Sequence, residues 1–349
     1  MNLQTAEAVL EREVRRLYEV PEGAALESLE EPKQTYVRYA LETVKRGRLA
    51  LDELRPFKRL KDIRFLDAGC AYAGFLAAAA EAGAREVVGV DIDDRFLDIA
   101  RPFISATGIR HKIEKGDVSD PAFLSSFGRF DLITCNDVIE HVDSVPRCLE
   151  SLAGALAQDG YLYLAAPNRM CPDFLRKDPH FQYFGIVLLE RPDARRYYVE
   201  KTRWPHYDVG DYFDLPEFRR ILEGHGLEMQ VLNAPGEAEA PQVVNRLEDD
   251  FREIEALGAA FEDPAAPADL VAKIKREVVA AVATFRGRLE RYRSLEAAGG
   301  PEAGAAALEL ARDYAVPVWH ILGHRPAGDG RSAEKPPGLW QRLRGALRG

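Results

Sequence analysis

Short apolar runs alternate with amphipathic stretches through the central part of the chain. Apolar residues that recur every three or four positions indicate helices, whereas short continuous apolar runs bounded by turn residues indicate buried strands. The predicted strands are 63–69, 85–91, 111–117, 130–137, 160–168 and 227–233, and the predicted helices are 74–82, 93–106, 145–157 and 215–226. This alternation predicts an α/β fold with a doubly wound, mostly parallel sheet.

The two ends of the chain have patterns of their own. Residues 3–19 and 25–55 show helical periodicity and precede the first predicted strand. Residues 243–297 are polar and helical, and an apolar, β-branched run at 314–326 surrounds Pro317. We predict a seventh strand there, at the edge of the sheet or bulged, because proline cannot donate a ladder hydrogen bond.

These patterns predict how the chain is divided. We expect an N-terminal helical segment at 1–58, a cofactor-binding domain at 59–241 that includes a cap at 169–214 and is completed by a strand at 314–324, a helical insertion at 242–313, and a flexible basic tail at 325–349. The alternative is that the helices before the last strand form a separate C-terminal dimerisation module. The sequence does not decide whether the protein is a monomer or a homodimer.

Charge and cysteine usage exclude several classes of protein. A net charge of −10 over 349 residues argues against nucleic acid as a partner, because neutralising phosphates requires clustered Lys and Arg. The dispersed cysteines form no Cys-x-x-Cys pair, which argues against a zinc knot or a disulfide scaffold. No apolar run reaches the roughly 18 residues of a membrane span, and the N-terminus lacks a signal-peptide pattern. We therefore expect a cytoplasmic protein.

The segment 65–74, FLDAGCAYAG, links the first predicted strand to the helix that follows it. A loop in this place presents the N–H groups of a helix N-terminus to a bound cofactor. Gly69 permits the turn and Gly74 permits close helix packing, although such glycines also occur in ordinary turns. Asp91 stands 22 positions after Gly69, at the end of the second strand, where a carboxylate can accept both ribose hydroxyls. The alternative role for Asp91 is to cap the next helix, which Asp93 can also do.

Polar residues at the other strand ends distinguish between cofactors. Asp67 precedes the glycines, where it would repel a dinucleotide pyrophosphate and attract an ammonium group. Asp117 ends the third strand and can accept from an adenine amino group, and Asn136 and Asp137 end the fourth. The rival hypothesis, an NAD-dependent dehydrogenase, is disfavoured by Asp67 and by the lack of a second nucleotide-binding half.

The chain resembles the class I S-adenosylmethionine-dependent methyltransferases through the ordered set LDAGCAYAG, VVGVD, GDV, FDLITCNDVIEHV and GYLYLAAPN. It is similar to the branch that contains the ubiquinone-biosynthesis O-methyltransferases and glycan-modifying enzymes, over residues 60–233. The resemblance implies a seven-stranded Rossmann-like sheet with an antiparallel last strand, and S-adenosylmethionine as cofactor. The implied cofactor-binding residues are Asp67, Gly69, Cys70, Ala71 and Gly74 around the methionine end, Asp91 and Ile92 at the ribose, Asp117 and Val118 at the adenine, and Asn136 near the sulfonium.

Two alanines, Ala71 and Ala73, depart from this family, which usually carries glycine at one or both positions. A methyl group narrows the φ range that the loop can adopt. We expect this change to affect cofactor affinity more than the fold. A loop that no longer supports chemistry is the basis of a further hypothesis, a non-catalytic cofactor-binding module.

His141 is the candidate catalytic base, with Asp137 as its partner. Methyl transfer depends mainly on orientation, together with a base when the acceptor is a hydroxyl. Asp137 and His141 are four positions apart, so on a helix they would share a face. The alternative is that His141 has a structural role.

A metal site is another interpretation of the same stretch. Asp137, Glu140 and His141 would begin it, in a cluster similar to that of the metal-dependent small-RNA 2′-O-methyltransferases. His180 or His206 would complete it. A Glu-His pair after the fourth strand also occurs in metal-free relatives, and the acidic balance disfavours RNA. We therefore expect no metal.

The insert after the fifth strand is rich in aromatic residues, with Arg and Lys interleaved. Aromatic platforms with Arg suit a sugar, a phosphorylated group or a phenol, whereas the alternative is that these rings pack on one another. The expected substrate-binding residues are Asn168, Tyr183, Trp204, His206 and Tyr207. We expect O-methylation of a small molecule or a saccharide.

Overall fold

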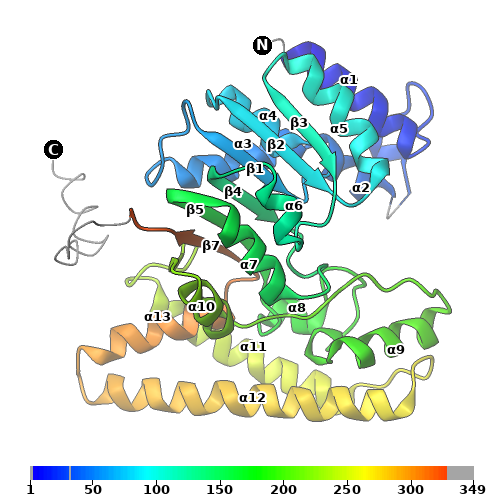
Figure 1. Ribbon diagram of the computed structural model, residues 1–349. Helices are drawn as coiled ribbons and strands as arrows, with labels where there is room; N and C mark the ends of the chain where they lie inside the picture. Colours follow the sequence, from blue (N-terminus) through cyan, green and yellow to red (C-terminus); the bar gives the residue numbers. More distant parts are fainter. Residues whose placement is uncertain (1–2, 31–32, 328–349) are drawn as a thin grey trace.

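A seven-stranded sheet forms the centre of the molecule (Figure 1). The computed structural model describes residues 3–30 and 33–327. The strands are β1 (Arg64–Ala68), β2 (Glu86–Asp91), β3 (His111–Lys115), β4 (Phe130–Asn136), β5 (Leu156–Pro167), β6 (Glu228–Val231) and β7 (Val318–His324). They lie in the order β3-β2-β1-β4-β5-β7-β6, with β1 to β5 parallel and β7 antiparallel to both of its neighbours. The predicted fold class is confirmed.

The last strand, β7, lies inside the sheet, between β5 and β6. The prediction of an edge or bulged strand was therefore wrong. Pro317 precedes the strand instead of interrupting it, so its missing N–H removes no ladder hydrogen bond. Its carbonyl oxygen accepts a hydrogen bond from the Asn168 N–H at 2.8 Å. Pairing with β5 then runs without a register shift from Val318 to His324.

Helices cover both faces of the sheet (Figure 1). One face packs against α1 (Leu3–Leu17), α3 (Thr43–Leu54), α4 (Gly74–Glu81) and α5 (Asp94–Thr107), and the other against α6 (Pro121–Ser125), α7 (Val145–Ala155) and α10 (Leu215–Gly224). Neighbouring residues of one strand enter different cores: Phe65 belongs to the first and Leu66 to the second. Burial on both faces explains why the strands read as continuous apolar runs in the sequence.

Three long helices separate β6 from β7: α11 (Ala240–Ala260), α12 (Ala268–Ala297) and α13 (Glu302–Tyr314). They share one hydrophobic core with the segment after β5, which contains α8 (Pro172–Arg176), the 3-10 turn η2 (Ile186–Leu188) and α9 (Arg191–Thr202). Phe251 and Phe285 stack there with ring centroids 4.1 Å apart. After these three helices the chain returns to the sheet as β7.

The N-terminal segment is less continuous than its periodicity predicts. The stretch predicted as helical at 25–55 contains the 3-10 turn η1 (Leu26–Ser28), α2 (Lys33–Leu41) and α3, with Leu29 in an extended conformation. The sequence carries a proline at position 32, and proline disfavours helix in the residue directly before it, which the periodicity does not register. From residue 328 onward the predicted basic tail lies outside the described residues. Among the helices of the described ranges, none has the length and apolar character needed to cross a membrane.

Candidate active site at the carboxyl edge of the sheet

The polar residues singled out in the sequence meet at one edge of the sheet. Because β1 to β4 are parallel, the loops after them lie side by side. Asp67 is the fourth residue of β1, Asp91 ends β2, Asp117 follows β3, and Asn136 ends β4. The structure therefore brings these four predicted cofactor residues to the same edge.

The loop between β1 and α4 is strained at its two alanines. Ala71 has φ 38° and Ala73 has φ 63°, in the left-handed region where a side chain is disfavoured. Gly69 has φ 83°, and a Cβ there would lie 2.2 Å from Cγ2 of Val138 in the loop after β4. Glycine is therefore required at 69, whereas the alanines hold a backbone conformation that glycine would adopt more easily.

Asp91 holds this loop in place. Its Oδ2 accepts from the Ala71 N–H at 2.8 Å and its Oδ1 accepts from the Asp93 N–H at 2.9 Å. The capping role belongs to Asp93, which accepts from the Arg95 N–H at the start of α5. Because backbone N–H groups fix both carboxylate oxygens of Asp91, their remaining lone pairs point in a defined direction and can accept further hydrogen bonds.

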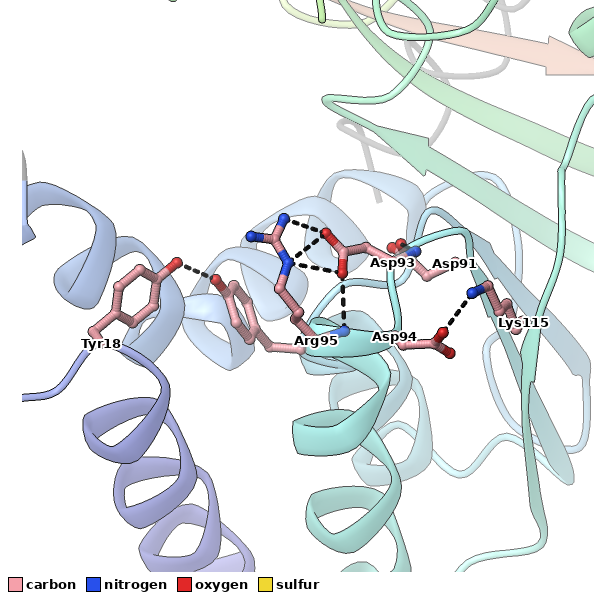
Figure 2. A network of polar contacts seen from close by, with 7 residues as sticks. Tyr18, Asp91, Asp93, Asp94, Arg95 and Lys115 are labelled. Atoms are coloured by element: carbon pink, nitrogen blue, oxygen red, sulfur yellow. Dashed lines mark hydrogen bonds and ion pairs between the residues drawn. The ribbon is translucent and has the colours of Figure 1, made fainter. Parts of the chain in front are cut away.

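Figure 2 shows how the first helix joins this region. Tyr18, just after α1, and Tyr72 of the loop are linked through their hydroxyl oxygens, 2.6 Å apart. On the other side, the Arg95 guanidinium pairs with the Asp93 carboxylate. Tyr18, which is not part of the loop's own sequence motif, therefore braces the loop through Tyr72.

Asp67 is buried, with 3% of its surface exposed. Thr134 donates its hydroxyl to Oδ1 of Asp67 at 2.7 Å. Burial raises the pKa of Asp67 to about 7; the Thr134 hydrogen bond opposes this rise, and the negative charge of Asp91 adds to it. A cationic group placed beside Asp67 would favour its ionised form.

The predicted adenine and sulfonium residues differ in their surroundings. Ile92 is a large apolar side chain that is 70% exposed, whereas Val118 is buried. Asp117 accepts from the Ser119 N–H at 2.7 Å, and Asn136 donates its amide to Oδ2 of Asp137 at 2.8 Å. An exposed isoleucine at this edge is available to pack against a flat ring.

Tyr39 and Arg46 reach the same edge from α2 and α3, and no sequence pattern pointed to them. The Tyr39 hydroxyl donates to Oδ2 of Asp137 at 2.7 Å. The Arg46 guanidinium lies over the Tyr39 ring, 3.4 Å from its centroid, and its Nε is buried without a hydrogen-bond partner. A buried, unpartnered guanidinium nitrogen is the type of group that receives a carboxylate. Residues 39 and 137 are 98 positions apart, so only the tertiary structure brings them together.

The segment 137–144 after β4 is a turn and not the helix that the spacing of Asp137 and His141 assumed. α7 begins only at Val145, where Ser144 caps it, and Asp137 has φ 54°. The two residues therefore share no helical face, and that part of the prediction was wrong. His141 is instead held by its Nδ1, which donates to the backbone carbonyl of Asp208 at 2.8 Å.

Glu140 and His180 lie beside His141. Glu140 is 5% exposed and its Oε2 has no hydrogen-bond partner. Burial raises the pKa of Glu140 to about 7 and lowers the pKa of His180 to about 4. The His141 and His180 rings meet edge to face at 5.1 Å, and the Tyr212 hydroxyl is 3.1 Å from Nδ1 of His180. Glu140, His141 and His180 each offer one ligand atom within 4.8 Å of the others, so they could hold a metal ion; His206 is not in this group.

The predicted substrate residues fall into three groups. Asn168 is fully buried, and its side-chain amide donates to the backbone carbonyls of Asp313 and Val316. It therefore fixes the segment that leads into β7 and does not face a substrate. Tyr183 and Tyr207 belong to a cluster of aromatic rings that pack on one another. Trp204 and His206 are exposed, with ring centroids 5.6 Å apart.

A sheet of this order with a reversed seventh strand, and carboxylates at the tips of β1 and β2, defines the class of S-adenosylmethionine-dependent methyltransferases. A family model described as a methyltransferase domain matches residues 36–231. The chain belongs to this family, and S-adenosylmethionine is its cofactor.

Curated relatives are similar over part of their length. A ubiquinone biosynthesis O-methyltransferase of Bordetella avium (strain 197N) is 29% identical over 116 residues, which cover 33% of this chain and 47% of that protein. One of Thiobacillus denitrificans (strain ATCC 25259 / T1) is 28% identical over 169 residues, 48% of this chain and 66% of that protein. The chain spans about half the length of the first relatives that it matches.

Among solved structures, the magnesium protoporphyrin IX methyltransferase of Synechocystis PCC 6803 with bound SAH is 17% identical, with a TM-score of 0.42 over 63% of this chain and 85% of that chain. A methyltransferase from Mesorhizobium loti is 20% identical, with a TM-score of 0.40 over 59% of this chain and 92% of that one.

Proposed function

We propose that this chain transfers a methyl group from S-adenosylmethionine to an oxygen atom of a small molecule or a saccharide, with His141 as the base. The observation that carries the proposal is the contact of His141 with the carbonyl of Asp208. A carbonyl can only accept, so Nδ1 carries the proton and Nε2 of the neutral ring keeps its lone pair. That lone pair can take the proton of an acceptor hydroxyl.

The residues at the sheet edge match the parts of the donor. Asp67 would receive its ammonium group and the unpartnered Nε of Arg46 its carboxylate. Asp91 would receive the ribose hydroxyls, and the exposed Ile92 would pack on the adenine. When bound, S-adenosylmethionine supplies an electrophilic methyl group on a sulfonium. The proton released by the acceptor passes to His141.

The acceptor would lie against the cap, where Trp204 and His206 are exposed. The names of the curated relatives favour oxygen as the methylated atom. We further propose a cytoplasmic location, supported by the four cysteines, which are all buried and free of disulfides.

Binding and turnover test the proposal separately. Calorimetry with S-adenosylmethionine, S-adenosylhomocysteine and NAD distinguishes a methyltransferase from a dehydrogenase. Methyl transfer from labelled donor to a set of phenols and sugars then distinguishes an enzyme from a non-catalytic binding module. Donor binding without turnover on any acceptor would favour the module.

The His141→Ala variant tests the base. We expect turnover to fall by at least about 100-fold, the usual contribution of a general base, with donor affinity nearly unchanged. His225→Ala, at the C-terminal end of α10, is the matched control and should retain activity. Equal loss of turnover and donor affinity would make His141 a structural residue.

One observation favours a second candidate, a metal-assisted transfer of the type found in RNA 2′-O-methyltransferases. Glu140, His141 and His180 place their ligand atoms within 4.8 Å of one another. Two imidazoles and a carboxylate suit a divalent transition metal. Activity that survives dialysis against EDTA supports the metal-free reaction, whereas activity lost on chelation and restored by Mn²⁺ or Zn²⁺ supports the second candidate.

A further inference from the structure

One short stretch of the cap, Asp208–Gly210, lies directly on the turn after β4. The Gly210 N–H donates to the backbone carbonyl of Glu140, and the Asp208 carbonyl accepts from His141. Tyr212, two residues further, contacts His180, whose ring packs on that of His141. The candidate base therefore contacts residues that come from a distant part of the chain, while its own side chain remains exposed.

Gly210 permits this close approach. A Cβ at position 210 would lie 2.8 Å from the carbonyl oxygen of Val142 and 2.9 Å from that of Glu140. Both are backbone atoms, which cannot rotate away as a flexible side chain could. Any larger residue would push the stretch 208–210 away from the turn and separate the Asp208 carbonyl from His141.

The hydrogen bond to the Asp208 carbonyl decides which ring nitrogen of His141 can accept a proton. A neutral imidazole has one N–H and one lone pair, and the hydrogen bond of one nitrogen determines the state of the other. The side chain of His141 is exposed, and its hydrogen bond to the Asp208 carbonyl orients the ring. Without the Asp208 carbonyl, the ring would lose its orientation. The tautomer that carries its proton on Nδ1 would then no longer be stabilised over the other one.

We propose that the cap stretch Asp208–Gly210 completes the reaction centre by setting the tautomer and position of His141, with Gly210 and Tyr212 as positioning residues. The proposal rests on the proposed function in which His141 is the base. It means that the base exists in its active form only when the cap is docked on the turn after β4.

The Gly210→Ala variant tests the proposal. We expect kcat to fall by about 10- to 100-fold, part of the contribution of a general base. The Kd for S-adenosylmethionine should change less than about twofold, because Asp67 and Asp91 lie at or near the ends of other strands. Proton–nitrogen NMR of the histidine rings should show the His141 proton on Nδ1 in the wild type and its loss from Nδ1 in the variant.

The matched control is Gly287→Ala, because a Cβ at position 287 of α12 meets nothing within 4 Å. It should leave kcat and the His141 signals unchanged. If Gly210→Ala does not fold, Tyr212→Phe replaces it, since it removes one hydroxyl and leaves the backbone intact; a fall in kcat of about threefold or more with unchanged donor Kd supports the proposal.

Three results would overturn the proposal: a wild-type His141 that carries its proton on Nε2, a Gly210→Ala protein with wild-type kcat, or equal losses of kcat and donor affinity. The NMR readout does not depend on any acceptor. A chain that fails to methylate anything would therefore refute the proposed function, while the ring spectra would still decide whether the cap sets the His141 tautomer.

Discussion

Among single residues, Asp91 is the one that we propose to bind the ribose of the donor. Its carboxylate is held by the N–H groups of Ala71 and Asp93. Asp91→Ala removes a charged acceptor and also releases the loop. We expect the affinity for S-adenosylmethionine to fall by more than about 10-fold, because a hydrogen bond to a charged group contributes about 1.5–3 kcal/mol. Titration calorimetry measures the change.

Asp93→Ala is the control for this variant. It removes the cap of α5, which should cost about 1 kcal/mol of stability while leaving donor affinity close to that of the wild type. A wild-type donor affinity in Asp91→Ala would refute the ribose assignment.

If Asp67 receives the ammonium group as proposed, donor binding should depend on pH. Burial raises its pKa from 3.8 to about 7, so the folded free protein keeps a proton that the unfolded chain has already released. The stability of the free protein should therefore fall as pH rises from about 4 to about 7. An ammonium ligand needs the ionised carboxylate, so donor affinity should rise through the same window. Calorimetry at pH 6 and pH 8, with Asp67→Asn as a pH-insensitive control, measures this; a flat wild-type profile would contradict it.

At the scale of elements, Tyr39 ties α2 to the turn after β4. Its hydroxyl donates to Asp137, which is 98 positions away. Tyr39→Phe removes this bond and frees α2 at the donor edge, so we expect donor affinity to weaken by about fivefold, since a partly exposed charged hydrogen bond contributes about 1 kcal/mol. Tyr36→Phe is the control, because the Tyr36 ring is 52% exposed and stacks on Tyr18. Faster donor release in stopped-flow measurements would accompany the loss; equal effects of both variants would contradict the role of Tyr39.

At the scale of the whole molecule, the cap and the helical insertion form one unit because they share a core. Phe251 is almost fully buried in that core, against Phe285 and Tyr314. Phe251→Ala should cost about 3–5 kcal/mol of unfolding free energy. Leu257, on the same helix, is 41% exposed, and Leu257→Ala should cost less than about 1 kcal/mol.

The loosened core should affect turnover more than donor binding, because the predicted donor residues lie on the sheet edge. Urea denaturation and donor calorimetry on the two variants measure both effects. A Phe251→Ala protein with wild-type stability would show that the shared core contributes little.

Prediction from the sequence placed residues accurately where they stand at or near the ends of local elements, whereas the roles assigned to them stay predictions. Asp67, Asp91 and Asn136 stand at strand ends, and the ends of parallel strands meet at one edge. It failed where distant segments meet. Asn168 was assigned to the substrate but is buried under the approach to β7, and Tyr39 and Arg46 were missed because their partners are remote in the chain.

The sequence by itself determined the strand–helix alternation, the class of the sheet and the row of polar residues along its carboxyl edge. These follow from local periodicity, since the period of apolar residues sets both the element and its buried face. Only the tertiary structure decided that β7 lies inside the sheet, that the cap and the insertion share a core, and that a cap carbonyl holds His141. Those features depend on which remote segments pack together, and a local pattern contains no information about that choice.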